Sequence, residues 1–233
     1  MDNLNKKIEA LLKKASTGFR IAMEREDIQS YLLPYGYGNS RLQDLIDLYS
    51  ETNDRYLLQK RAYAEYMKVK QELRKKFKEE QTRYMDFRKL SSQALSAPSD
   101  KQYHFFLGIE VRMARATGRF VSQAKYFYKT ALTTKELLDK LAYFKITPEK
   151  LEAGLNGIEA LEHLMSARIA SRGYAKGATY ERDAFYQKLM RAYSGFVEAS
   201  KISMRDLPQL RELLGIRERS KPVRKKKTAT NGA

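Results

Sequence analysis

Apolar residues recur at helical spacing through most of this chain. Near the N-terminus they form one stripe, which predicts an amphipathic helix over about residues 3–25. The stripe consists of Leu4, Ile8, Leu11, Leu12, Ala15, Phe19, Ala22 and Met23. A second stripe, from Val111 to Leu132, predicts a similar helix over 111–132. Thr133 or Thr134 can then cap a short helix that runs to Ala142.

Two longer stretches follow these helices. In the first, every seventh residue forms a series whose phase never slips: Leu42, Tyr49, Tyr56, Tyr63, Lys70, Phe77, Tyr84 and Ser91. A constant phase favours one continuous helix over 40–95, because a loop would shift it. The matching stretch 148–203 contains Gly173 and Gly177, which are typical of a helix end and a turn. A helical hairpin is therefore the alternative in both stretches.

Punctuating residues bound these stretches. Pro34-Tyr35-Gly36-Tyr37-Gly38 cannot continue a helix, so Asn39 or Ser40 is expected to cap the next one. Thr147, Pro148 and Glu149 have the types expected at a cap, a first helical position and an acidic first turn. Short helices over 100–107 and 206–214 are predicted to end at a glycine.

The second half of the chain repeats the plan of the first, at a constant offset that pairs Ile28 with Leu137 and Tyr35 with Phe144. Identities are few, but the substitutions stay within class, as in these two pairs. Both halves end on Leu-Gly-Ile, at Leu107 and Leu214. We therefore predict an all-α fold, a tandem repeat of two similar antiparallel helical-bundle units over 1–109 and 110–216. The alternative is two unrelated helical halves that share generic patterning.

Composition limits the class of protein. The chain has no cysteine, which excludes disulfides and thiolate metal sites. The N-terminus lacks the apolar segment of a signal peptide, and no apolar run reaches about 18 residues. These features predict a cytoplasmic protein with no membrane span.

The net charge of +17 is spread along the sequence. Residues 1–109 carry +5, residues 110–216 carry +6, and the short segment 217–233 carries +6. That last segment is expected to be a disordered basic tail. Its cations Arg224, Lys225, Lys226 and Lys227 are candidate contacts for nucleic acid.

No residue constellation indicates catalysis. His104 and His163 lack partners at metal-binding spacing, and neither recurs in the other half. Glu79 and Glu80 lie among lysines and are interpreted as charges on a solvated helix face. We therefore expect no enzymatic activity, no metal and no cofactor.

The stretch 60–88 interleaves cations with aromatic residues, as contacts to a phosphate backbone and to unstacked bases require. Its candidate nucleic-acid contacts are Lys68, Arg74, Lys75, Lys76 and Lys78. The alternative is a solvated face on which Glu72 pairs with Lys76, Lys75 with Glu79 and Lys76 with Glu80, with the aromatic residues in the core. The equivalent stretch of the second half has fewer cations, so such a surface would belong to one half only.

The segments Leu33-Pro34-Tyr35-Gly36-Tyr37 and Ala178-Thr179-Tyr180-Glu181-Arg182-Asp183 resemble those of a loose group of uncharacterised bacterial all-helical proteins. Their units have about this length, and the group has no assigned activity that the resemblance could imply. We therefore expect a helical scaffold or interaction module, with a protein partner or self-association. The alternative is a nucleic-acid-associated protein that uses the helix around 60–88 and the C-terminal tail.

Overall fold

The computed structural model describes residues 2–216, and every regular element in that range is a helix. The predicted all-α class is confirmed. In chain order the elements are α1 (Asp2–Glu24), α2 (Glu26–Leu32), η1 (Leu33–Tyr35), α3 (Asn39–Ala94), η2 (Pro98–Asp100), α4 (Lys101–Phe106), α5 (Thr117–Thr133), α6 (Lys135–Ala142), α7 (Pro148–Ser203) and α8 (Pro208–Leu213).

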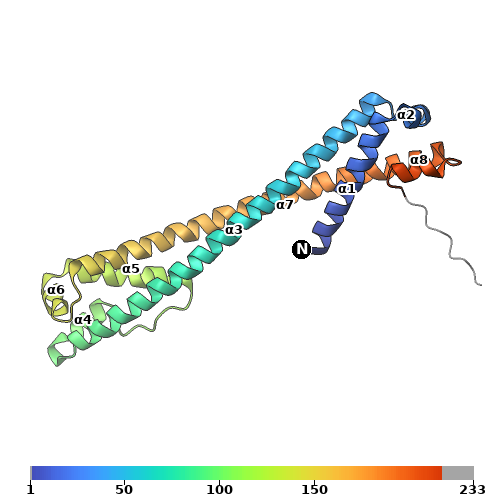
Figure 1. The fold of residues 1–233 in the computed structure, drawn as a ribbon. Helices are drawn as coiled ribbons and strands as arrows, with labels where there is room; N and C mark the ends of the chain where they lie inside the picture. The colour runs from blue at the N-terminus through green and yellow to red at the C-terminus, as the bar shows by residue number, and fades with distance from the viewer. Residues whose placement is uncertain (1, 217–233) are drawn as a thin grey trace, which may run out of the picture. The chain divides into compact units, whose positions relative to one another are not determined.

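The helices α3 and α7 are each continuous over 56 residues (Figure 1). The hairpin alternative is therefore wrong in both stretches. Gly173 and Gly177 lie inside α7, and neither takes the left-handed conformation of a helix end. The constant phase of the apolar series was the reliable signal, because an uninterrupted helix preserves that phase along its whole length.

The predicted helix ends are present at several positions. The 3₁₀ turn Leu33–Tyr35 ends at Gly36 with φ +82°, before α3 begins at Asn39. Pro148 is the first residue of α7, and the Thr147 hydroxyl lowers the pKa of Glu149 by hydrogen bonding to its carboxylate.

The two Leu-Gly-Ile segments close their halves in the same way. The Ile109 amide donates to the His104 carbonyl at 2.9 Å, and the Ile216 amide donates to the Arg211 carbonyl at 3.0 Å. Gly108 and Gly215 take φ of +64° and +74°, which a residue with a side chain rarely adopts. These are Schellman ends, in which a left-handed glycine lets the next amide reach back to the helix.

The helix predicted over 111–132 begins only at Thr117. Residues 109–116 form a loop that long-range contacts hold out of helical conformation. The Arg88 guanidinium donates to the carbonyls of Ile109 and Val111, and the Ala114 amide donates to Gln123 Oε1 at 2.9 Å. The apolar spacing runs through this loop, so it gave no indication of the later start.

The described residues form two compact units, one over 60–177 and one that combines 2–59 with 178–216. We call them the central unit and the terminal unit. Each takes helices from both predicted repeat units, 1–109 and 110–216, whose limits concern sequence similarity and stay a prediction.

The core of the terminal unit is formed by α1, the first part of α3, the last part of α7 and α8. Phe19 of α1 lies at its centre, where its ring packs edge to face on Phe196 at 5.1 Å and on Tyr193 at 5.9 Å. Ile8, Leu42 and Leu214 are also fully buried, which gives this unit an apolar core of its own.

The core of the central unit is built around α5. Phe120 packs edge to face on Phe77 and Tyr84 of α3, with ring centroids 5.1 and 5.6 Å apart. Tyr128 packs in the same way on Phe87 at 5.9 Å. The rings of the seven-residue series are therefore mostly core residues, as the solvated-face alternative expects.

Candidate functional site

The net charge is divided unequally between the compact units. The central unit holds 24 basic and 13 acidic side chains, a net charge of +11. In the terminal unit, residues 1–59 and 178–216 hold 14 of each and are neutral. Division at residue 109 concealed this difference, because each half of the sequence contributes to both units.

Four of the predicted contact residues, Lys68, Arg74, Lys75 and Lys78, are exposed on α3 within the central unit. Arg74 and Lys78 are four residues apart, and Lys68 and Lys75 are seven apart, so each pair lies on one side of the helix. No ion pair involves any of these four among residues 2–216. Their positive charge is therefore directed to solvent.

Lys76, the fifth predicted contact on this helix, has a different role. Its ammonium lies 2.9 Å from a carboxylate oxygen of Glu80. Arg83 lies 3.0 Å from the same carboxylate and also donates to the Ala153 carbonyl at 3.3 Å. Of the three predicted pairs along α3, the pair of Lys76 with Glu80 is the one that forms within the described residues.

Glu80 is fully buried, which corrects its interpretation as a charge on a solvated face. Its carboxylate lies against Gly157 of α7, where a side chain would overlap it. Burial of a carboxylate costs free energy unless cations and donors satisfy it. Lys76 and Arg83 supply the positive charge that neutralises the Glu80 carboxylate. Lys76 is therefore a weaker candidate for contact with nucleic acid than Lys68, Arg74, Lys75 and Lys78.

Two aromatic residues of the stretch stay outside the core. Tyr63 is 38 % exposed, and its ring centroid lies 6.3 Å from that of the half-buried Tyr66. The ammonium of Lys70 stands 6.0 Å from the Tyr66 centroid, at the limit of a cation–π contact. Aromatic rings and positive charges are therefore close together and accessible to solvent on this part of α3.

Three exposed arginines add to the positive charge of the central unit. Arg112 and Arg115 lie in the loop before α5, and Arg119 lies in its first turn. The loop is fixed by Arg88 and Gln123, as described above. The predicted tail contacts Arg224, Lys225, Lys226 and Lys227 lie outside the described residues.

The histidines have separate surroundings. A ring nitrogen of His104 lies 3.0 Å from the Leu95 carbonyl, whereas His163 is exposed on α7. Within residues 2–216, no group of three or more His, Asp or Glu side chains is placed to hold a metal ion. The same range contains no helix long and apolar enough to cross a membrane.

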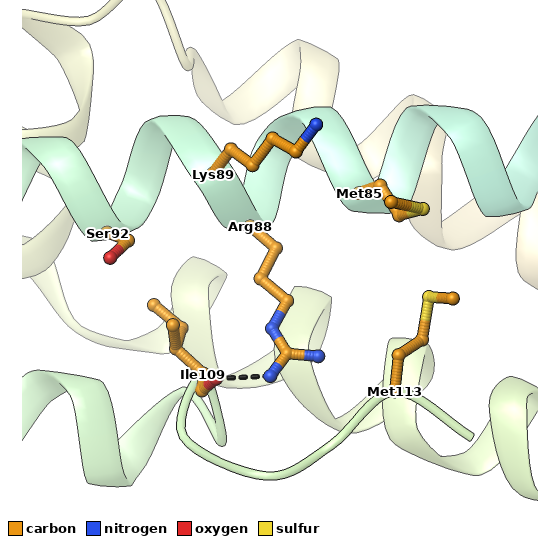
Figure 2. A pocket seen from close by; sticks show the side chains of 6 residues that line it. All are labelled: Met85, Arg88, Lys89, Ser92, Ile109 and Met113. Carbon is orange, nitrogen blue, oxygen red and sulfur yellow. Dashed lines mark hydrogen bonds between the residues drawn. The ribbon is translucent and has the colours of Figure 1, made fainter.

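A cavity of about 330 Å³ opens in the central unit between α3 and the loop before α5 (Figure 2). Met85, Arg88, Lys89 and Ser92 line it from α3, and Ile109 and Met113 line it from the loop. Its surface is almost entirely apolar, although two cations stand in its wall. Sequence reasoning missed this cavity, because its two walls are separated in sequence and are brought together by tertiary contacts such as those of Arg88.

Comparison with known proteins gives no relative. No protein family, no curated protein and no solved structure matches the chain. Any function must therefore be argued from the side chains described above.

Proposed function

We propose that this chain is a non-enzymatic helical interaction protein whose central unit binds nucleic acid. The observation that carries the proposal is the charge of +11 on residues 60–177, whereas residues 1–59 and 178–216 of the terminal unit are neutral together. A polyanion gains affinity from every cation that displaces its counterions, so charge gathered in one unit favours binding there. We also propose that the protein is cytoplasmic.

Solvent-directed cations support the proposal further. Lys68, Arg74, Lys75 and Lys78 make no ion pair within residues 2–216, so binding a phosphate breaks no internal contact. A solvated helix face would instead neutralise most of its cations with neighbouring carboxylates. Of the three predicted pairs, the one that forms within residues 2–216 joins Lys76 to the buried Glu80.

Nucleic acid is favoured over other polyanions by the exposed rings. Tyr63 and Tyr66 lie on the same helix as these cations, and an unstacked base can stack on such a ring at about 1–3 kcal/mol per base. An acidic protein or an anionic membrane would use the cations but would gain less from the rings. Single-stranded nucleic acid is therefore the expected form.

The test is a salt titration with mixed-sequence single-stranded DNA and RNA. Changing Lys68, Arg74, Lys75 and Lys78 to Gln should weaken binding and reduce the log–log salt slope by about 0.7 for each cation that contacts a phosphate of a single strand. The matched control changes Lys6, Lys7, Lys13 and Lys14, four exposed cations of α1 in the terminal unit, to Gln. Both variants lose four positive charges. A difference between their affinities would therefore show that binding depends on where the cations lie and not on net charge alone.

The outcome also decides the role of the tail. Binding that survives removal of residues 217–233 and is lost in the α3 variant supports the proposal. Equal loss in both lysine variants would mean that overall charge alone attracts the polyanion. Loss only on removing the tail would contradict a role for the central unit.

A protein partner or self-association is the second candidate, and exposed apolar side chains of α7 favour it. Ile169 is 73 % exposed and Tyr174 is 59 % exposed, both within the central unit. Changing Ile169 to Arg should lower the mass measured by sedimentation if this face joins two copies. An unchanged monomer mass in the parent chain at high concentration would remove self-association.

The tandem repeat is also part of the proposal. Four facts support it: the same order of helices in both halves, two long helices of equal length, two Schellman ends, and burial at corresponding positions. Ala15 and Ala124, Ile28 and Leu137, and Ser91 and Ser200 are such buried pairs, all related by the same offset.

A further inference from the structure

The cavity between α3 and the loop before α5 has the composition of a site for an amphiphilic ligand (Figure 2). Met85 and Met113 face one another across it, and Ile109 completes the apolar lining. Methionine side chains are flexible and polarisable, so they adapt to an aliphatic chain. A volume of about 330 Å³ is at the lower end of the range for small-molecule sites.

The cations of the cavity differ in what they can bind. Arg88 crosses from α3 to the loop, where one terminal nitrogen donates to the carbonyls of Ile109 and Val111. This guanidinium therefore holds the wall in place. Lys89 lines the cavity from α3 and is exposed, with its ammonium pointing away from Ile109 and Met113 (Figure 2), and no ion pair involves it among residues 2–216.

We propose that this cavity binds a free single-chain carboxylate of the medium-chain fatty acid type. The aliphatic chain lies among Met85, Met113 and Ile109, where it leaves water. The exposed Lys89 side chain turns its ammonium to the mouth of the cavity, where it pairs with the carboxylate. This site is separate from the proposed nucleic-acid contacts at residues 68–78.

The corresponding place in the terminal unit offers an internal comparison. A hollow there is lined by Tyr193 and by the repeat counterparts of four lining residues of the first cavity, namely Ser194, Val197, Glu198 and Lys201. Ser194 replaces Met85, Val197 replaces Arg88 and Glu198 replaces Lys89. Lys201 replaces Ser92, so the terminal hollow has a cation of its own, but its lining contains no methionine and its Glu198 would repel a carboxylate.

The experiment observes the methyl groups of the eight methionines by NMR in the full chain, without nucleic acid. Decanoate is the probe, decanol is the uncharged chain, and decyltrimethylammonium is the chain of opposite charge, all below their micelle concentrations. Decanoate should shift the Met85 and Met113 signals saturably and leave the other methionines in place. Decanol should bind about tenfold more weakly, and the ammonium compound should shift neither signal.

Two substitutions of equal charge test the rim. Lys89→Glu reproduces the residue of the terminal unit and should weaken decanoate binding about tenfold while leaving decanol unchanged. Lys129→Glu, an exposed position on α5, should leave both affinities unchanged. Met113→Gln should weaken decanoate and decanol alike, because it makes the wall polar.

Three outcomes would overturn the proposal. One is that decanoate shifts no methionine signal. Another is that it shifts all of them, which indicates nonspecific association. The third is that decanoate and decanol bind equally in both the parent chain and the Lys89→Glu variant. None of these outcomes depends on nucleic-acid binding, so this inference and the proposed function fail or succeed separately.

Discussion

The carboxylate of Glu80 in α3 occupies the space that a side chain at Gly157 of α7 would need. A Cβ at residue 157 would lie less than 3.0 Å from both carboxyl oxygens, closer than such atoms approach in proteins. Glu80 is fully buried, and Lys76 and Arg83 hold its carboxylate from the solvent side. Residue 157 therefore has to be a glycine, because any side chain there would overlap the Glu80 carboxylate.

Gly157→Ala should lower the free energy of unfolding by roughly 1–3 kcal/mol, because the carboxylate must move away from its cations. This loss runs against the helix propensity of alanine, which alone would add about 1 kcal/mol. The measurement is urea unfolding followed by circular dichroism. Gly173→Ala is the control, since nothing lies within 4 Å of its added Cβ, and it should stabilise the chain.

A double-mutant cycle then tests whether Glu80 is the cause. In a Glu80→Ala background, the carboxylate is absent and Gly157→Ala should cost much less. An equal cost in both backgrounds would show that some other contact opposes the new methyl group.

Tyr128→Phe should stabilise the protein by about 0.5–1 kcal/mol at neutral pH. The Tyr128 hydroxyl is buried without a hydrogen-bond partner in residues 2–216, so the substitution removes an unsatisfied polar group and keeps the ring. Tyr126→Phe is the control, because that side chain is 55 % exposed and its loss should change little. A clear destabilisation by Tyr128→Phe would indicate that the hydroxyl is satisfied.

The same tyrosine predicts a loss of stability in alkali. Burial raises the pKa of Tyr128, and the carboxylate of Glu80 raises it further. An unfolded tyrosine ionises near pH 10, so the folded chain retains this proton more tightly. The contribution is fully present below about pH 10 and is lost as pH rises above it. Unfolding midpoints at about pH 8 and pH 11 should differ less in Tyr128→Phe than in the parent chain.

Arg182→Leu should cost roughly 1–3 kcal/mol in the terminal unit. Arg182 is 5 % exposed and donates to Gln59 at 3.2 Å, to Asn5 at 3.3 Å and to Asp183 at 2.7 Å. Under the proposed repeat its counterpart is the buried Leu73, so leucine is expected to be compatible with this helix. Changing Gln59 to Leu as well should recover part of the loss, since no buried amide is then left unpaired. A double variant as unstable as the sum of the singles would contradict this assignment.

Gln123→Ala should loosen the loop before α5. Its amide oxygen accepts from the Ala114 amide at 2.9 Å, so hydrogen exchange at Ala114 should speed up about tenfold or more when the side chain is removed. Ser122→Ala is the control, because that hydroxyl bonds within α5, to the Gly118 carbonyl. Unchanged exchange at Ala114 would mean that Arg88 alone holds the loop.

The sequence predicted those elements that the regular spacing of apolar residues determines, above all the long helices. The unbroken phase from Leu42 to Ser91 favoured a continuous α3, whereas Gly173 and Gly177 left a hairpin open as the alternative for α7, which is also continuous. Glycine inside a helix lowers its stability but does not end it unless the backbone turns left-handed, as at Gly108 and Gly215.

The features that periodicity missed depend on contacts between distant segments. The contacts of Arg88 and Gln123 keep residues 109–116 in a loop, so that α5 begins only at Thr117. The apolar spacing around Val111 gives no sign of these contacts. Glu80 resembled a surface charge because lysines surround it in sequence. It is buried because Gly157 of α7 has no side chain and leaves room for its carboxylate. The charge of the central unit was hidden because the division at residue 109 falls inside the continuous stretch 60–177 that forms this unit.

The division of helices between the compact units has a consequence for half of this chain. Residues 1–59 lie in one unit and residues 60–109 in the other, so the first half alone holds an incomplete part of each. Under the proposed repeat, in which the second half follows the plan of the first, a second copy of the first half could supply what is missing. A fragment over 1–109 should then fold only as a domain-swapped homodimer, with a mass in sedimentation twice that of its chain.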